Sequence, residues 1–442
     1  MVCAMPQHIR YTLLSLRDLA ASIGPFVLLA AALLTLAYWW LDPNPPKRVT
    51  LATGPAQSAY EAFGKDYAKA LKTDGIEVVL VPSEGSAANL QLLRDGKVDL
   101  GFVQGGTSTY TEADEVQLAS LGSLFIEPLW LFYKSAADLT SLSALAGKRV
   151  NTGTPGSGVP SLMGKLFDSN RIDPATLTLS QLEQTPATVA FLGGDLDAIV
   201  FASAPESLMV QMLLQTPGVK LMNFAQSEAY SRRFPFLTPT RLPRGLVDLA
   251  GNIPPDDVQL VAPTTSLITR TATHPALQQL FAQAGNTLHS GAGWFKNARE
   301  FPNRGNNELP IAKEAERAIK TGAPALQRYV NFWVANLVER MWLVLGIILA
   351  ILLPLSRVIP PLYAFRVRSR IFRWYAQLRD IEARAADMGH PGHSLSRDTL
   401  VGELNALENR AEKINVPLSY ADELYALRSN IALVRARLLA LA

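Results

Sequence analysis

Two uncharged apolar stretches constrain this chain more than any other feature of its sequence. No charged residue occurs from Leu19 to Leu41, and the second stretch, Met341 to Ser356, holds 16 uncharged residues. A helix rises about 1.5 Å per residue, so about 20 residues cross a hydrocarbon layer of roughly 30 Å. Residues 334–338 or 358–363 lengthen the second stretch. We therefore predict transmembrane helices at residues 19–41 and 337–358.

The first stretch favours a retained anchor over a cleaved signal peptide. It ends in Tyr38-Trp39-Trp40-Leu41, without the small residues that a signal peptidase site requires. Tryptophan and tyrosine are typical of the interface between membrane and water. We expect this helix to stay in the lipid bilayer.

Arginines beside both stretches predict the orientation of the chain. Arg10 and Arg17 precede the first span, and a group of five follows the second: Arg357, Arg366, Arg368, Arg370 and Arg373. Basic residues collect on the cytoplasmic side of membrane helices. We expect a cytoplasmic segment at 1–18, a cytoplasmic region at 364–442, and the main domain in the periplasm, anchored to a bacterial inner membrane.

Composition excludes several classes of function. A formal net charge of +3 with 18% charged residues gives no case for nucleic-acid binding. The single cysteine, Cys3, excludes an intramolecular disulfide and a cysteine-based zinc site. Neither a Gly-x-Ser-x-Gly nor a His-Glu-x-x-His motif occurs. We predict no enzyme, no catalytic residue, no metal and no cofactor, with Asp99 and Asp197 in turn or capping roles.

Between the two spans, short β-like runs alternate with helical patterns, which predicts α/β layers. Ser58 and Glu61 form a capping-box pattern, and Ser86 is a predicted helix N-cap. A weak repeat aligns "LLRDGKVDLGFV" with "AFLGGDLDAIVF", which places Gly96 over Gly194 and Asp99 over Asp197. One explanation of this repeat is a pair of similar lobes. The alternative is that junctions between a helix, a glycine and a strand generally resemble one another.

The glycine-rich stretch "GTPGSG", residues 153–158, links a predicted strand to a predicted helix. A nucleotide phosphate loop is excluded, because Val159 and Pro160 stand where it needs lysine and serine or threonine. Backbone N–H groups and the hydroxyls of Thr154 and Ser157 lie before a helix N-terminus, where a carboxylate is well held. A connector without any ligand is the alternative.

Other loops at predicted strand ends point to the same edge: 53–58, 83–86, 104–107 and 203–205. In open α/β sheets such ends converge on one crevice. The loops carry hydroxyl and amide groups and hardly any acid or histidine. This chemistry suits hydrogen bonding to a small solute.

Five blocks carry a family resemblance: "LATGPAQSAYEAFG", "PSEGSAANLQLLRDGKVDLGFVQ", "LAGKRVNTGTPGSGV", "GGDLDAIVFASAP" and "LPRGLVDLAGNIPPDDVQLVAPTTSLI". They are similar, over residues 47–300, to the TAXI-type solute-binding subunits of TRAP transporters, and the two spans resemble the membrane-anchored branch. The resemblance implies a type II periplasmic-binding-protein fold with two lobes and a cleft. It also implies a small carboxylate ligand, glutamate-like or dicarboxylate, and a TRAP permease as partner.

The blocks and the loop pattern together give ten candidate ligand-binding residues: Gly54, Ser58, Tyr60, Ser86, Gln104, Thr154, Gly156, Ser157, Gly158 and Ser203.

After a helical linker at 301–335 and the second span, apolar residues at helical spacing predict a helical hairpin or bundle. Self-association through these C-terminal helices is possible. We predict a membrane-anchored periplasmic solute-binding protein that serves a TRAP-type transporter. The alternative is a sensor or scaffold that relays binding outside to the cytoplasmic helices.

Overall fold

The computed structural model describes residues 7–205, 207–387, 397–412 and 420–440, so Cys3 lies outside the described residues. The chain divides into two compact units, which are described separately. One comprises Asn44–Leu337 and the other Met1–Pro43 with Val338–Ala442.

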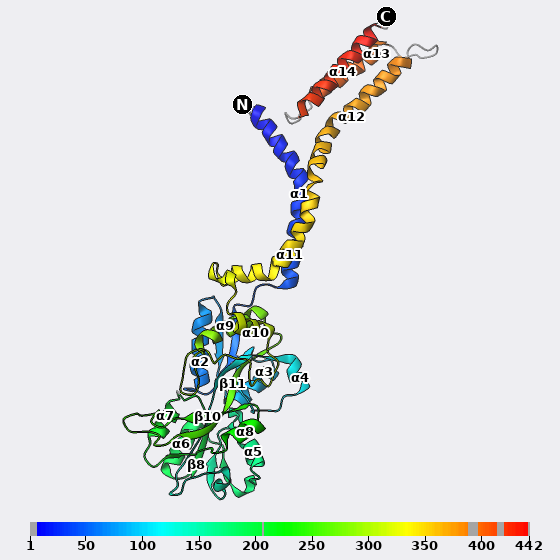
Figure 1. Ribbon diagram of the computed structural model, residues 1–442. Helices are drawn as coiled ribbons and strands as arrows, with labels where there is room; N and C mark the ends of the chain where they lie inside the picture. The colour runs from blue at the N-terminus through cyan, green and yellow to red at the C-terminus, as the bar shows by residue number, and fades with distance from the viewer. Residues whose placement is uncertain (1–6, 206, 388–396, 413–419, 441–442) are drawn as a thin grey trace, which may run out of the picture. The chain divides into compact units, whose positions relative to one another are not determined.

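The larger unit contains two sheets (Figure 1). The first has the order β10-β11-β3-β1-β2, with β4 paired to β11. Its β1, β2 and β3 are parallel, and β11 runs antiparallel to β3, β4 and β10. Its strands are β1 (Arg48–Ala52), β2 (Glu77–Val81), β3 (Leu100–Gln104), β4 (Leu118–Ile126), β10 (Leu237–Leu242) and β11 (Val258–Arg270).

Helices pack against this first sheet and enclose a core around Tyr67, Phe102 and Phe281. The helices of this lobe are α2 (Ala59–Lys72), α3 (Ser86–Arg94), α4 (Glu112–Gln117), α9 (Pro275–Leu288) and α10 (Lys313–Thr321). Burying such aromatic side chains is the main source of stability for a lobe of this kind.

The second sheet has the order β7-β6-β8-β5-β9, and its core includes Trp130, Phe167 and Phe191. Its strands are β5 (Leu129–Tyr133), β6 (Arg149–Asn151), β7 (Thr178–Ser180), β8 (Ala198–Ala202) and β9 (Lys220–Leu221). The helices of this lobe are α5 (Val159–Ser169), α6 (Gln184–Gly193), α7 (Leu208–Gln215) and α8 (Ser227–Arg233). Short 3₁₀ turns occur at Leu142–Leu145, Pro155–Ser157, Pro174–Thr176 and Ala325–Arg328.

The chain passes to the second lobe where β4 of the first sheet leads into β5, and it returns to the first sheet between α8 and β10. Only Glu127 and Pro128 separate these strands. The predicted α/β fold with two lobes is confirmed by this arrangement.

The sequence repeat corresponds to the same junction in both lobes. Asp99 Oδ2 accepts hydrogen bonds from the backbone N–H and the hydroxyl of Thr50, at 2.8 and 2.7 Å. Asp197 Oδ2 accepts the backbone N–H of Arg149 at 2.8 Å. The two glycines aligned by the repeat, Gly96 and Gly194, both have a positive φ, of 68° and 91°. Each aspartate therefore caps a neighbouring parallel strand, as predicted, and has a structural role.

The two predicted helix caps have different outcomes. Ser58 caps α2, with its hydroxyl accepting the N–H of Glu61 at 3.3 Å, but the predicted capping box is incomplete, because the Glu61 carboxylate accepts the N–H of Gln57 at 2.6 Å. Ser86 is not an N-cap, because Gly85 precedes the helix and Ser86 is its first residue. The Ser86 hydroxyl has partners inside the protein instead, Tyr60 and the N–H of Gln104.

The second unit contains the first helix that sequence analysis assigned to the membrane and, from Val338 onward, the second. Ala20–Leu41, within α1 (Gln7–Leu41), and α11 (Phe332–Ser356) are long and apolar enough to cross a membrane. Three helices follow: α12 (Ile359–Asp387), α13 (Arg397–Ala411) and α14 (Ala421–Ala440).

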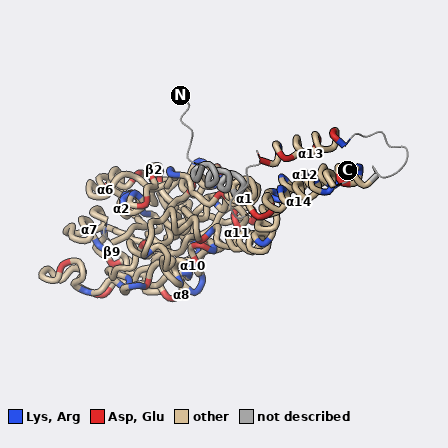
Figure 2. Tube along the Cα trace, turned by 90° about the horizontal axis from the view of Figure 1, so that it is seen from above, with Lys and Arg blue, Asp and Glu red and all other residues tan. Residues whose placement is uncertain are grey.

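The last three helices share one apolar core. Apolar residues recur at helical spacing along α14 and are buried at Leu427, Ile431, Val434 and Leu438. Acidic and basic residues both occur along these helices (Figure 2), and several pair, as Arg384 does with Glu403.

Candidate functional site

Four polar side chains and the backbone of Gln104 are linked by hydrogen bonds beside the junction between the lobes. Tyr60 is the second residue of α2, Ser86 begins α3, Gln104 ends β3, Glu127 follows β4, and Thr265 lies on β11. All five are buried. Tyr60 Oη donates to Glu127 Oε2 at 2.6 Å and lies 2.9 Å from Ser86 Oγ. Thr265 Oγ1 donates to the same Glu127 oxygen, and Ser86 Oγ accepts the Gln104 N–H at 3.0 Å. We call these five residues the polar cluster.

The carboxyl of Glu127 dominates the electrostatics of the polar cluster. Burial raises its pKa to about 7, although the hydroxyls of Thr265 and Tyr60 favour the charged form. Burial, together with the charge of Glu127, raises the pKa of Tyr60 well above its usual range. Tyr60 therefore stays protonated and remains a hydrogen-bond donor at neutral pH.

Two atoms of the polar cluster have unused hydrogen-bonding capacity. Gln104 Nε2 is buried and has no hydrogen-bond partner among the described residues. Both hydroxyls that reach Glu127 bond its Oε2, and no described residue donates to its Oε1. Gln104 lies directly opposite Thr265 in the β3–β11 ladder, so both side chains share one face of the sheet. Buried polar groups are normally paired, so the polar cluster has the form of a ligand contact surface.

The glycine-rich loop of the second lobe meets the first lobe. It precedes α5, where Gly158 has a φ of 88° and occupies the N-cap position. The Gly156 N–H donates to Glu84 Oε2 at 3.1 Å. A Cβ added to Gly85 would lie only 2.9 Å from the Cα of Ser157. The lobes therefore touch through two loops that sequence analysis assigned to a shared crevice.

The remaining predicted residues have supporting positions. Gly54 packs against Ser58, since a Cβ there would fall 2.7 Å from its Oγ. The Ser157 hydroxyl donates within its own loop, to the carbonyl oxygen of Thr154 at 2.7 Å. The carbonyl oxygen of Ser203 accepts Trp130 Nε1–H at 2.9 Å, next to the junction between the lobes. Sequence analysis missed Glu127 and Thr265.

Two cavities lie near the polar cluster, and Ile126 lines both. The smaller one, of about 30 Å³, lies between the lobes, with Phe125 and Ala204 among its walls. The five residues of the polar cluster are not among those lining this cavity.

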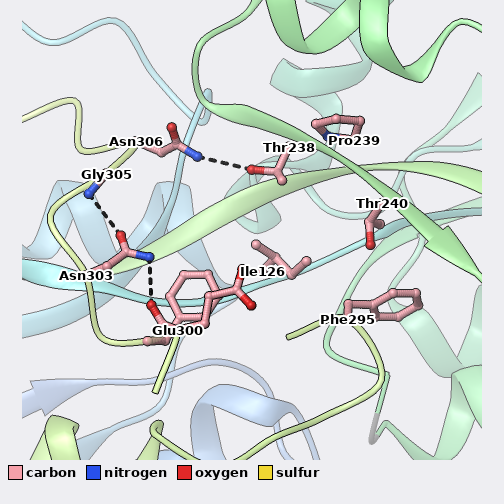
Figure 3. Close-up of a pocket in the computed structure, with 10 residues that line it drawn as sticks. Ile126, Thr238, Pro239, Thr240, Phe295, Glu300, Asn303, Gly305 and Asn306 are labelled. Carbon is pink, nitrogen blue, oxygen red and sulfur yellow. Dashed lines mark hydrogen bonds between the residues drawn. The ribbon is translucent and has the colours of Figure 1, made fainter. Parts of the chain in front are cut away.

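The larger cavity, of about 300 Å³, also includes Ile126 and Phe295 in its lining (Figure 3). Its polar lining is largely satisfied within the protein: Asn306 Nδ2 donates to Thr238 Oγ1 at 3.1 Å, and Glu300 Oε2 accepts the N–H of Asn297 at 2.6 Å. The ten predicted residues are not among those lining either cavity. We place the candidate site at the polar cluster, because it joins three predicted residues to a buried acid and contains an unpaired buried amide, Gln104 Nε2.

In the described part of the chain, no group of three or more His, Cys, Asp or Glu residues is arranged to hold a metal ion.

Several solved structures are similar to this chain. An ancestral arginine-binding protein bound to arginine is 17% identical with a TM-score of 0.36, covering 55% of this chain and 93% of that chain. The GluR0 ligand-binding core from Nostoc punctiforme in complex with (L)-glutamate is 18% identical with a TM-score of 0.34, covering 54% and 92%. The alkanesulfonate-binding protein SsuA from Xanthomonas axonopodis pv. citri bound to MOPS is 16% identical with a TM-score of 0.37, covering 55% and 74%.

Similarity at this level does not identify a ligand. The model of the NMT1-like family matches residues 51–278, which is just over half of the chain and includes the polar cluster and the glycine-rich loop. The finer assignment to the TAXI type stays a prediction. The chain belongs to the NMT1-like family, a family of periplasmic solute-binding proteins.

Proposed function

We propose that this chain is a membrane-anchored solute-binding protein whose two lobes close on a small carboxylate outside the cytoplasm. The observation that carries the proposal is the contact between Gly156 and Glu84. There, an N–H of the glycine-rich loop already binds a carboxylate oxygen, at 3.1 Å.

The glycine-rich loop has the properties of a carboxylate site. It leads into the N-terminus of α5, where unpaired N–H groups and the helix dipole favour a negative charge. Glu84 is exposed and belongs to the other lobe, so a solute carboxylate can replace its side chain at the Gly156 N–H as the lobes open and close. The polar cluster then forms the opposite wall of the cleft.

The two apolar helices support a tethered form of the protein. We propose that α1 and α11 cross the inner membrane, with both termini in the cytoplasm and the solute-binding unit in the periplasm. Tethering keeps the local concentration of a binding protein high beside a membrane partner. That partner is proposed to be a TRAP-type permease.

Isothermal titration of the full-length protein in lipid nanodiscs tests binding. The solutes are L-glutamate, 2-oxoglutarate and succinate, with an uncharged sugar as the negative control. We expect one of the carboxylates to release or absorb heat with a stoichiometry of about one per chain and to raise the melting temperature. A flat titration with all three, and no thermal shift, contradicts the proposal.

A relay function is the second candidate, and the close succession of α11 and α12 favours it. The first ends at Ser356 and the second begins at Ile359, so the bundle follows the span almost directly. Deleting residues 364–442 separates the two functions. Uptake that survives the deletion supports transport, whereas unchanged binding with lost signalling supports the relay.

A further inference from the structure

A lysine of the second lobe binds the backbone of the first. Lys165 lies on α5, and its Nζ donates to the carbonyl oxygen of Gly106, in the loop that follows β3, at 2.7 Å. The same ammonium group lies 5.2 Å from the centre of the Phe236 ring, within the range of a cation–π interaction. Hydrogen bonds from a charged donor are stronger than those between neutral groups. This contact is therefore a strong link between the two lobes.

Gly106 is held in place from several sides. Its N–H donates to Glu308 Oε2 at 2.8 Å, so its amide and its carbonyl group both bind charged side chains. Its φ of 79° lies in the region that favours glycine. A Cβ added there would fall 2.4 Å from the ring of Phe236. The acceptor for Lys165 is thus fixed to the first lobe, and any movement of α5 away from that lobe breaks the bond.

The loops beside Lys165 are packed directly against each other. A Cβ added to Gly158 would lie 2.8 Å from Thr107 Oγ1, which belongs to the first lobe. The Gly156 N–H binds the carboxylate of Glu84 in the same way, from one lobe to the other. These are the surfaces between which the proposed function places a solute. A solute bound there has to move the loops apart.

Resting on the proposed function, we infer that Lys165 is a latch that holds the lobes together and opposes solute binding. Lys165 lies on the helix that the glycine-rich loop begins, so a solute held by that loop displaces Lys165 from Gly106. Only the unlatched fraction of the protein is then competent to bind, and the apparent affinity is reduced by that fraction. Weakening the latch opens the lobes and raises the affinity.

The distance between the lobes tests the latch without any solute. Full-length Cys3→Ser protein in nanodiscs carries nitroxide labels at Gln91→Cys on α3 and Asp168→Cys on α5, both exposed positions. Double electron–electron resonance should give mainly one short distance when Lys165 is present. Lys165→Met, which keeps the length and loses the charge, should add a longer distance. Because Lys165 is half-buried, we expect the ratio of long to short distances to rise about 3- to 30-fold.

Lys134→Met is the matched control. Lys134 Nζ donates to the carbonyl oxygen of Leu192 at 2.9 Å and lies 5.3 Å from the centre of the Phe191 ring, so it makes the same two kinds of contact inside the second lobe. This variant should leave the distances unchanged. Gly106→Ala alters the latch from the first lobe and should add the longer distance.

Circular dichroism establishes that each variant is folded. The protein with Lys165 intact tests the latched form even if a variant fails to fold, because a predominantly long distance in it overturns the inference. Identical distances with Lys165 and with Lys165→Met also overturn it.

Titration then tests the effect on binding. A carboxylate that releases or absorbs heat with wild type should bind Lys165→Met about 3- to 30-fold more tightly and bind Lys134→Met as wild type does. A weaker affinity of Lys165→Met overturns the inference, because Lys165 would then stabilise the solute-bound form. The longer distance in Lys165→Met, combined with no heat from any carboxylate, supports the latch and contradicts the proposed function.

Discussion

Replacing Glu127 with glutamine should change the pH dependence of stability in a direction opposite to that of most acid substitutions. The folded protein raises the pKa of Glu127 to about 7, from an ordinary value of 4.5. As pH rises through this interval the unfolded chain releases its proton first, so the folded state loses stability. A difference of about 2.5 pKa units corresponds to about 3 kcal/mol, all of it lost by about pH 8.

Glu127→Gln removes this titration while keeping the shape of the side chain. We therefore expect the free energy of unfolding of the variant, relative to wild type, to rise by about 3 kcal/mol between pH 4.5 and pH 8. Urea unfolding of the full-length protein in detergent, without solute and followed at several pH values, measures this difference. A constant difference across that range would refute the argument that Glu127 is held as an uncompensated buried acid. Greater stability combined with lost solute binding would be typical of a functional residue.

Three further predictions concern other parts of the chain. Glu84→Gln weakens the contact with the Gly156 N–H, which then becomes more available to a carboxylate solute. The affinity for that solute, measured by titration, should increase about 2- to 10-fold. An unchanged affinity would argue against the glycine-rich loop as the carboxylate site. The hydrogen bonds from Arg94 lower the pKa of Asp114 to about 2. This shift contributes about 2 kcal/mol to the free energy of unfolding, which is present above pH 4 and lost as pH falls toward 2. Asp114→Asn should therefore be less stable at pH 7 and nearly unchanged at pH 2, and equal destabilisation at both pH values would exclude this cause. Leu427→Ala, in the core of the C-terminal bundle, should reduce the free energy of unfolding of the bundle by about 2–5 kcal/mol, as measured by thermal unfolding. The solute affinity should stay unchanged. An altered affinity would favour the relay function.

The features that sequence analysis predicted correctly are encoded by neighbouring residues. The apolar stretches, the Ser58 cap and the strand-to-helix glycine loop all depend on residues within one or two helical turns. The helical spacing of the apolar residues buried along α14 is likewise visible in the sequence.

The features that it missed depend on contacts between distant residues. Glu127 interrupts an apolar run, and its partners Tyr60 and Thr265 lie 67 and 138 residues away in the chain. A single acid inside a buried run was a usable signal, because such a group must find hydrogen bonds. The partners themselves could not be identified without the sheet register. The Ser86 prediction failed for the same reason, since its hydroxyl bonds across the fold to Tyr60 instead of capping its own helix.

A crystal structure with bound solute would test the central proposal most directly, because it locates the solute between the lobes or elsewhere. We predict density that contacts both Glu127 and the loop at residues 153–158. Density in the larger cavity beside Thr238 and Glu300, with the polar cluster unchanged, would contradict the proposed site.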